Sequence, residues 1–492
     1  MMLNAIRDKV SQNKAFVGIN FVFLTLYSLI CFVNHANYRT YALDLGAYTR
    51  ALYDYAHFHA SYGEVFRASP ENILSDHFDL LLMIFSPLWW IFGSLTLLIV
   101  QLIAICFGSW GVYKLAQENK LTKTPAVLAT TSFLAYFGIF SAVAFDYHSS
   151  VVAACMLPWF VLFFQLGENK KTILVFIFIL IAKENMALWM FFICSALLWI
   201  YRKIPSQRKT ALGLSIASLF FFIAIIFYVM PFFSPQKAYS HIEFHVLGNN
   251  FKEIILNILQ HPVRAFSLLF QNHLPDASLN YIKTETWIFW LISGGFLLIS
   301  RPVFLWMVLP VMLQKMYHDD PAKWSVAQQY NIEFAPLLAW CLIETIKNKT
   351  NKTQTVLSAI TLGCCVAVTI RLCDNTVGFV DKTRIRFYQA DHYKSDFNKE
   401  DLNDVLRAIP KDVIVSAQSM FVPHLIDKKA VYQYPIVKNA GYILLSNDIH
   451  AYPLTPKTIQ KQIDSLLSSK TTSTACVKKG IYLFKIQANA LY

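Results

Sequence analysis

Carboxylate, histidine and lysine side chains interrupt this otherwise apolar chain at a few places, and such groups can move protons or bind anions. The first is Asp44, in the segment 41–48 that follows the first long apolar stretch. A carboxylate there can accept a proton from a hydroxyl group. It can also act only as the N-cap of a helix expected over residues 45–55. Both interpretations stay open from the sequence.

Two further places carry charged or ionisable groups between apolar stretches. Asp146 and His148 lie between two of them and form either a solvated turn or part of a site. Lys183 and Glu184 interrupt an apolar run from 173 to 200. They can pair with each other, but two charges at such a position are costly, which favours a functional role.

Histidines supply the weak candidates for a metal site. His241, Glu243 and His245 have the residue types that bind divalent metal ions, but their spacing places them on one face only in a strand. His77 and His148 are two more candidates, so a divalent metal cofactor stays open. The nine cysteines show neither metal-binding spacing nor a disulfide framework, and we interpret them as small packing residues.

Composition sets the protein class. The chain has 492 residues, of which 56% are hydrophobic and only 15% are charged, whereas soluble domains carry about 25% charged residues. We therefore expect a polytopic membrane protein whose main partner is the lipid bilayer. The net charge of +13 lies mostly in loops between apolar stretches. That distribution sets membrane orientation and does not indicate nucleic-acid binding.

The apolar stretches predict an α-helical bundle of about eleven transmembrane spans, each of roughly 20 residues or somewhat fewer. They fall near 15–33, 96–116, 125–145, 150–166, 171–182, 186–200, 211–233, 285–299, 303–317, 331–346 and 354–373. One more apolar segment, 78–92, is short and broken by Pro87, and it ends in two tryptophans. We interpret it as a helix on the membrane surface.

Loop charges predict the orientation. If 78–92 does not cross, the short loops rich in Lys and Arg all fall on one side, so the N-terminus is cytoplasmic. Residues 1–373 then form the transmembrane domain, with outer loops 34–95 and 234–284. The second loop contains an amphipathic stretch, 251–270, which we interpret as an interfacial helix packed on the bundle.

Residues 374–492 have the composition of a soluble domain. Short β-type runs at 413–415, 430–432, 442–445 and 481–486 alternate with helices expected at 397–408 and 456–468. This pattern predicts a small α/β domain. The span count places it outside the membrane.

This topology brings most ionisable groups near membrane depth to the outer ends of the helices. Such groups should face a cavity, a partner or water. A polar crater above an apolar bundle suits a substrate with a polar head and a lipid tail. The groups are Asp44, Asp76, His77, Asp79, Asp146, His148, Lys183, Glu184, His241, Glu243, His245, His318, Asp319, Asp320 and Glu333.

The order of these features resembles one bacterial membrane-protein family, the domain of unknown function 2079, which is grouped with GT-C glycosyltransferases that use polyprenyl-phosphate sugars. The similarity covers nearly the whole chain. It is carried by Asp44 with Gly46, Ala51 and Leu52; His77 and Phe78 with Pro87 and Leu88; Phe145 to His148; Lys183 and Glu184; Leu247 and Gly248 with Pro262; Tyr330 with Pro336; and Val415 to Gln418 with Val422 to Leu425.

The resemblance implies a GT-C-like fold in the bacterial inner membrane and an inverting transfer of a sugar from a polyprenyl-phosphate donor. Asp44 would be the catalytic base. Lys183 would bind the phosphate, with His148 and His77 as secondary donors. The prenyl tail would lie in an apolar groove whose entrance is lined by residues 78–92, and the C-terminal domain would bind the acceptor or cover the crater.

Other residues complete the expected substrate- and phosphate-binding set, namely Glu184, Asp146 and Tyr330. The chain departs from the family pattern at two positions. Asn185 stands where a carboxylate is expected, and Gln329 where a histidine is expected. A metal or phosphate role at these two positions is not predicted.

Two other classes of function fit the same charges. In a transporter they would line a translocation path, but the sequence shows no inverted repeat and the charges gather on one side. In a non-catalytic envelope protein the outer domain would bind a partner, and Asp44 and Lys183 could be replaced without loss of function.

Overall fold

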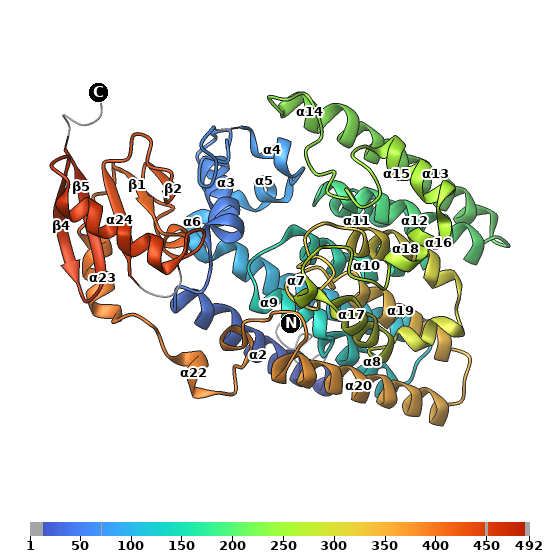
Figure 1. Ribbon diagram of the computed structural model, residues 1–492. Coiled ribbons are helices and arrows are strands. Elements are labelled where there is room, and N and C mark those ends of the chain that lie inside the picture. The colour runs from blue at the N-terminus through green and yellow to red at the C-terminus, as the bar shows by residue number, and fades with distance from the viewer. Residues whose placement is uncertain (1–12, 70, 448–450, 488–492) are drawn as a thin grey trace.

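The computed structural model describes residues 13–69, 71–447 and 451–487. It is mostly helical, with one five-stranded sheet near the C-terminus (Figure 1). The predicted succession of an apolar helical region and a small α/β region is confirmed at this level.

Four helical segments of the described chain are long and apolar enough to cross a membrane: Lys14–Ala36, Leu81–Glu118, Pro205–Phe233 and Asn351–Asp374. Helices α8 (Lys123–Leu134) and α9 (Phe137–Ala144) form a pair bent by 41°, which makes a fifth if it counts as one span. The count of about eleven spans is not confirmed.

Shorter apolar helices account for most of the difference in number. Helices α10 (Ser149–Gln165), α12 (Glu184–Ile200), α18 (Val303–Met316) and α19 (Phe334–Ile346) have 10–17 residues. A helix rises about 1.5 Å per residue, so these fall short of a 30 Å hydrocarbon layer unless the adjoining segments contribute. Composition alone cannot separate such helices from full spans.

The other labelled helices either make up the long segments or connect and flank them. In the first half of the chain they are α2 (Lys14–Ala36), α3 (Ala47–Ala56), α4 (Ile73–Asp76), α5 (Leu81–Phe85), α6 (Trp89–Phe92), α7 (Thr96–Glu118) and α11 (Asn169–Leu180). Further on they are α13 (Pro205–Ala224), α14 (Met230–Phe233), α15 (Phe251–Gln260), α16 (Pro262–Leu268), α17 (Ile282–Ile292), α20 (Asn351–Asp374), α21 (Lys382–Ile385) and α22 (Ala390–Tyr393). Single π and 3-10 turns join several of them.

Small residues allow the central helices to pack closely. A Cβ atom on Gly108 of α7 would lie 2.9 Å from atoms of Cys155 in α10, and one on Gly111 would lie 2.9 Å from Trp159. Close approach of backbones at small residues is a common way for helices to associate in membranes. Helices α7 and α10 are therefore closely packed against each other.

Segment 78–92 is not one continuous helix. It divides into α5, a 3-10 turn at Ser86–Leu88, and α6, with Pro87 inside the turn. Trp90 and Ile91 are exposed. Its position on the membrane surface stays a prediction.

The amphipathic stretch 251–270 forms two helices, α15 and α16, which meet at His261 and Pro262. Ile254 and Ile258 pack inward against Leu247, Leu268 and Tyr317. The opposite side of the helix pair leaves large apolar side chains exposed, namely Ile255, Leu259, Val263 and Phe266. The predicted packing of this stretch on the bundle is therefore observed, although as two helices.

The C-terminal sheet has the order β2-β1-β3-β5-β4. Its strands are β1 (Ile414–Ala417), β2 (Ala430–Gln433), β3 (Tyr442–Ser446), β4 (Thr472–Lys478) and β5 (Ile481–Ile486), and α23 (Lys399–Arg407) and α24 (Pro456–Ser468) accompany it. Strands β2, β1 and β3 are parallel, and β5 runs antiparallel to β3 and β4. The four expected strands and both helices are present. Strand β4 was missed because it is a largely exposed edge strand rich in Thr and Ser.

The C-terminal sheet region packs directly on the loop region 34–95 (Figure 1). Tyr38, Ala42 and Val65 belong to the same buried cluster as Phe421 and Val422. Val65 also accepts a backbone hydrogen bond from Gln433 N at 2.6 Å. The domain is thus held against the segment that carries Asp44.

Candidate functional site

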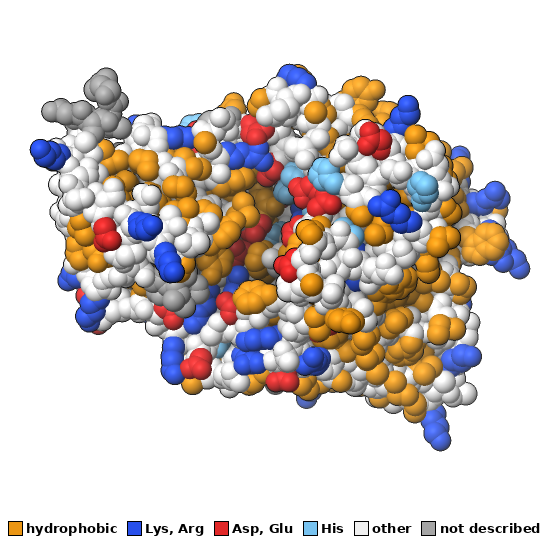
Figure 2. Space-filling view, in the orientation of Figure 1, with side chains coloured by type: hydrophobic (Ala, Val, Ile, Leu, Met, Phe, Trp, Pro, Cys, Tyr) orange, Lys and Arg blue, Asp and Glu red, His pale blue; other side chains and the backbone are white. Residues whose placement is uncertain are grey.

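A cavity of about 1020 Å³ opens between the loop regions 34–95 and 234–284, the ends of several apolar helices and the C-terminal sheet region. Figure 2 shows acidic and histidine side chains gathered at the centre of this face, in the hollow between the two parts of the molecule. Most of the predicted site residues line it: Asp44, His77, His148, Lys183, Glu184, His241, Glu243 and Tyr330. Asp146 and His245 are not part of its lining.

Asp44 lies in a π-helical turn, η1 (Ala42–Gly46), directly before α3. It does not cap α3, since no side chain bonds to the first turn of that helix. His148 Nε2–H donates to Asp44 Oδ1 at 3.2 Å, and the second carboxylate oxygen has no partner within the described residues. The His148 side chain is 3% exposed and that of Asp44 is 24% exposed, so the carboxylate faces the cavity.

Charge controls the protonation state of this pair. Burial alone would raise the pKa of Asp44, but the hydrogen bond from His148 and the positive charge of Lys183 lower it below its usual value. Burial lowers the pKa of His148. At neutral pH the pair is therefore an ionised carboxylate and a neutral imidazole.

The segment that carries His148 is a buried, hydrogen-bonded turn, which rules out the solvated alternative. Gln101 of α7 accepts a hydrogen bond from His148 N at 3.0 Å and donates to Asp146 O at 3.2 Å. The imidazole ring stacks on Phe145, with ring centroids 5.6 Å apart. Asp146 is 1% exposed and points away from the cavity.

Lys183 and Glu184 occupy the break between α11 and α12 and do not pair with each other. Glu184 instead accepts hydrogen bonds from His77 Nδ1–H at 3.1 Å and from Phe78 N at 3.2 Å. Lys183 lines the cavity and has no ion pair among the residues that the structure describes. Its ammonium group is thus available to an anionic ligand.

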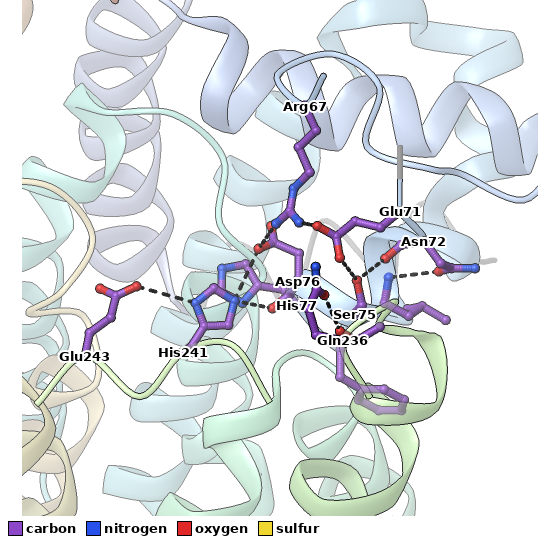
Figure 3. Close-up of polar contacts among 12 residues, drawn as sticks. Arg67, Glu71, Asn72, Ser75, Asp76, His77, Gln236, His241 and Glu243 are labelled. Carbon is purple, nitrogen blue, oxygen red and sulfur yellow. Dashed lines mark hydrogen bonds and ion pairs between the residues drawn. The ribbon is translucent and has the colours of Figure 1, made fainter. Parts of the chain in front are cut away.

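A second group of side chains, here called the histidine wall, consists of Asp76, His77, His241, Glu243 and His318. Figure 3 shows Asp76 between Arg67 and His241, with Glu243 beyond. Arg67 Nη2 donates to Asp76 at 2.6 Å, and His241 Nε2 lies 3.2 Å from the same carboxylate oxygen. Two further contacts complete the histidine wall. Glu243 Oε2 lies 3.2 Å from His318 Nε2, and the ring of His77 stacks on that of His241 with centroids 4.8 Å apart.

The charges of the histidine wall are well defined. Burial opposes the charged form of His241, but Asp76 and Glu243 outweigh it and raise its pKa to about 9. The nearby His241 imidazolium lowers the pKa of Glu243 to about 2. The gap of 3.8 Å between His241 Nδ1 and Glu243 Oε1 is too long for a hydrogen bond. A ligand hydroxyl there can accept from the imidazolium and donate to the carboxylate.

The metal candidates do not form a metal centre. Within the described ranges, no three His, Cys, Asp or Glu side chains are grouped so that they could hold an ion. His245 lies outside the cavity, is 62% exposed, and bonds to Asp319 at 2.6 Å. His77, His148, His241 and Glu243 each bond to a neighbouring side chain instead.

Two lysines of the cavity were missed by the sequence analysis. Lys323 Nζ donates to the Tyr330 hydroxyl at 2.6 Å, and Lys315 Nζ donates to the Tyr330 carbonyl at 2.8 Å. Lys315 interrupts the apolar sequence of α18, which was a usable signal. Tyr330 is thereby held between two lysine side chains.

Comparison with known proteins places the chain in a family. The family described as Predicted membrane protein (DUF2079) has a model that matches residues 35–481. The chain belongs to the DUF2079 family. The matched DUF2079 region contains every residue that lines the cavity. Its description names a membrane protein and no reaction, and no curated protein matches the chain.

Proposed function

We propose that this DUF2079 protein is a GT-C-like glycosyltransferase that moves a sugar from a polyprenyl-phosphate donor to an acceptor outside the cytoplasmic membrane. One observation carries the proposal. An ionised carboxylate, Asp44, and a cation, Lys183, that has no ion pair among the described residues line the same cavity in a membrane protein. A base and a fixed positive charge are the two groups that this transfer requires.

The reaction balances without a further reactant. The acceptor hydroxyl oxygen attacks the anomeric carbon from the side opposite to the phosphate, and Asp44 takes the hydroxyl proton. The bond between the anomeric carbon and the phosphate oxygen breaks, and the oxygen keeps the electron pair. Attack from the opposite side inverts the anomeric centre. Lys183 neutralises the negative charge that grows on the leaving phosphate.

The donor phosphate would lie between Lys183 and the Tyr330 hydroxyl, whose neighbour Lys323 adds positive charge. Sugar hydroxyls would face the histidine wall, where donors and acceptors alternate. A polar head of this kind therefore has a cationic contact at one end and a hydrogen-bonding surface at the other.

The prenyl tail would follow the apolar side of the cavity. Phe222 of α13, Ile226 of the following π turn and Phe251 of α15 line that side. No residue of 78–92 lines the cavity, so the expected entrance along that segment is replaced by one between α13 and α15.

The proposed orientation has a cytoplasmic N-terminus and an extracytoplasmic C-terminal domain, in the bacterial inner membrane. The loop charges support it. A reporter fused after Tyr492 tests it, because activity of a cytoplasm-dependent reporter at that position would contradict the orientation.

The direct test is a profile of polyprenyl-phosphate-linked sugars by mass spectrometry. A deletion strain is compared with strains rescued by the wild-type protein or by Asp44→Asn. One lipid-linked sugar should accumulate in the deletion strain and clear with the wild type, but not with the variant. Matching profiles, or full rescue by the variant, would favour transport or a non-catalytic role.

A further inference from the structure

The turn that carries Asp44 is held mainly by side chains from distant parts of the chain. Its own closing bond runs from Gly46 N to Tyr41 O at 2.9 Å. Asp146 Oδ2 accepts two backbone bonds from the same turn, from Tyr41 N at 3.2 Å and from Leu45 N at 3.5 Å. Ser419 of the C-terminal domain accepts a third, from Ala42 N at 3.1 Å.

The other oxygen of Asp146 is bound by an arginine from the C-terminal part of the chain. Arg384 Nη2 donates to Asp146 Oδ1 at 3.1 Å, and both side chains are buried. The guanidinium lies over the rings of Tyr41 and Phe145, 5.5 and 5.1 Å from their centroids. Arg384 therefore touches both the segment before Asp44 and the segment before His148.

A buried ion pair of this kind is weak evidence for added stability, because desolvation offsets most of its attraction. Here it has a specific geometric consequence. Asp146 can accept the backbone N–H groups of Tyr41 and Leu45 only while its carboxylate is fixed, and Arg384 fixes it. Asp146 and Arg384 thereby link the positions of Asp44 and His148, the hydrogen-bonded carboxylate and imidazole of the cavity.

We propose that Arg384, acting through Asp146, is a positioning residue that holds the Asp44 turn in its cavity-facing conformation. The C-terminal part of the chain thereby completes the site instead of only covering it. The catalytic consequence rests on the proposed function, whereas the positioning itself does not. In glycosyl transfer, the loss of Arg384 should lower kcat with little change in KM, since substrate contacts remain.

The test measures the turn directly. Leu43, which lines the cavity beside Asp44 and is exposed, is replaced by cysteine in the full-length protein, in which the partly exposed Cys106, Cys364 and Cys476 are replaced by serine. A membrane-impermeant maleimide then labels it in purified protein. Arg384→Gln and Asp146→Asn should each change the labelling rate about tenfold, because removing one partner leaves an unpaired buried group. Arg384→Lys should restore most of the original rate.

Two controls separate positioning from general loosening. Arg50→Gln removes another set of bonds between the first loop and the C-terminal domain, those to the carbonyl groups of Ile426, Lys428 and Lys429. It should leave the labelling rate unchanged. A cysteine at exposed Tyr62 should label equally in all variants.

The possible outcomes are distinct. Unchanged Leu43→Cys labelling in Arg384→Gln overturns the positioning proposal. An equal change at Tyr62→Cys also overturns it, because the loop as a whole has then loosened. If labelling changes as expected but Asp44→Asn rescues the deletion strain fully, the positioning stands and the proposed glycosyl transfer fails.

Discussion

The two ends of the cavity are built in different ways. At the Asp44 end the supporting groups, Gln101, Asp146 and His148, are almost fully buried. Gln101 and Asp146 bond to backbone atoms, and His148 bonds to the Asp44 carboxylate. At the histidine wall the ionisable groups are partly open, and Glu243 is 43% exposed. Buried residues that bond to a reacting group hold it in a narrow range of geometries, whereas partly exposed side chains can adapt to a ligand.

The two ends of the cavity also differ in how their charged groups are paired. Every carboxylate of the histidine wall has a basic partner, as Asp76 has Arg67 and His241. The Asp44 end contains Lys183, which has no ion pair among the described residues. Under the proposed function, we therefore expect the chemistry at the Asp44 end and the recognition of polar groups at the histidine wall.

Removal of the base should have the largest effect. We expect Asp44→Asn to slow the clearing of the lipid-linked sugar by about 10²–10⁴-fold, the range typical of a general base. Asp319→Asn is the matched control, because that carboxylate bonds to His245 outside the cavity. Equal losses in the two variants would remove the distinction between the ends of the cavity.

The unpaired cation should come second. Lys183→Gln should slow transfer by about 10²–10³-fold, as the loss of one fixed transition-state charge does. Lys183→Arg should retain part of the rate. Lys171→Gln is the control, since Lys171 pairs with Glu168 and does not line the cavity. Normal turnover by Lys183→Gln would contradict a phosphate role.

A substitution in the histidine wall should have a smaller effect than the loss of Asp44 or Lys183, and it should weaken substrate binding. His241→Gln is expected to raise KM about tenfold, the effect of losing one charge-assisted hydrogen bond, with kcat nearly unchanged. His245→Gln should do nothing, because its side chain lies outside the cavity. A fall in kcat as large as that of Asp44→Asn would move the chemistry to the wall.

The smallest effect concerns stability and pH. The folded-state pKa of His241, about 9, lies above its ordinary value of 6.5. The charged pair with Asp76 therefore contributes fully below the ordinary value and is lost as the pH rises through about 9. The Tm of the wild type should fall over this interval more than that of His241→Gln. Parallel curves from the two proteins would show that His241 is not charged in the fold.

Much of the site could be predicted from sequence because charge inside an apolar chain is costly. Asp44, Lys183 and Glu184 stand out for that reason, and the structure brings them to one cavity. The C-terminal elements were also predictable, since alternation and turn residues are local signals. Both inferences use short stretches of sequence.

Contacts across the chain could not be predicted. Asp146 was assigned to the substrate, yet it binds the Asp44 turn and Arg384, which lies 238 residues further along the chain. Glu184 was considered as a partner of Lys183, yet it pairs with His77. The predicted number of spans was larger than the number of long apolar helices because several apolar helices, such as α10 and α18, are short. Periodicity shows that a helix is apolar and does not show what surrounds it.

The most direct measurement is native mass spectrometry of purified Asp44→Asn, Lys183→Gln and wild-type proteins. The account predicts that Asp44→Asn retains an intact polyprenyl-phosphate-linked sugar, because binding persists while transfer stops. Lys183→Gln should retain little of it, and the wild type should carry mainly free polyprenyl phosphate or no lipid. If Asp44→Asn carries no lipid-linked sugar, or carries the same lipid as the wild type, Asp44 is not the base of a sugar-transfer reaction.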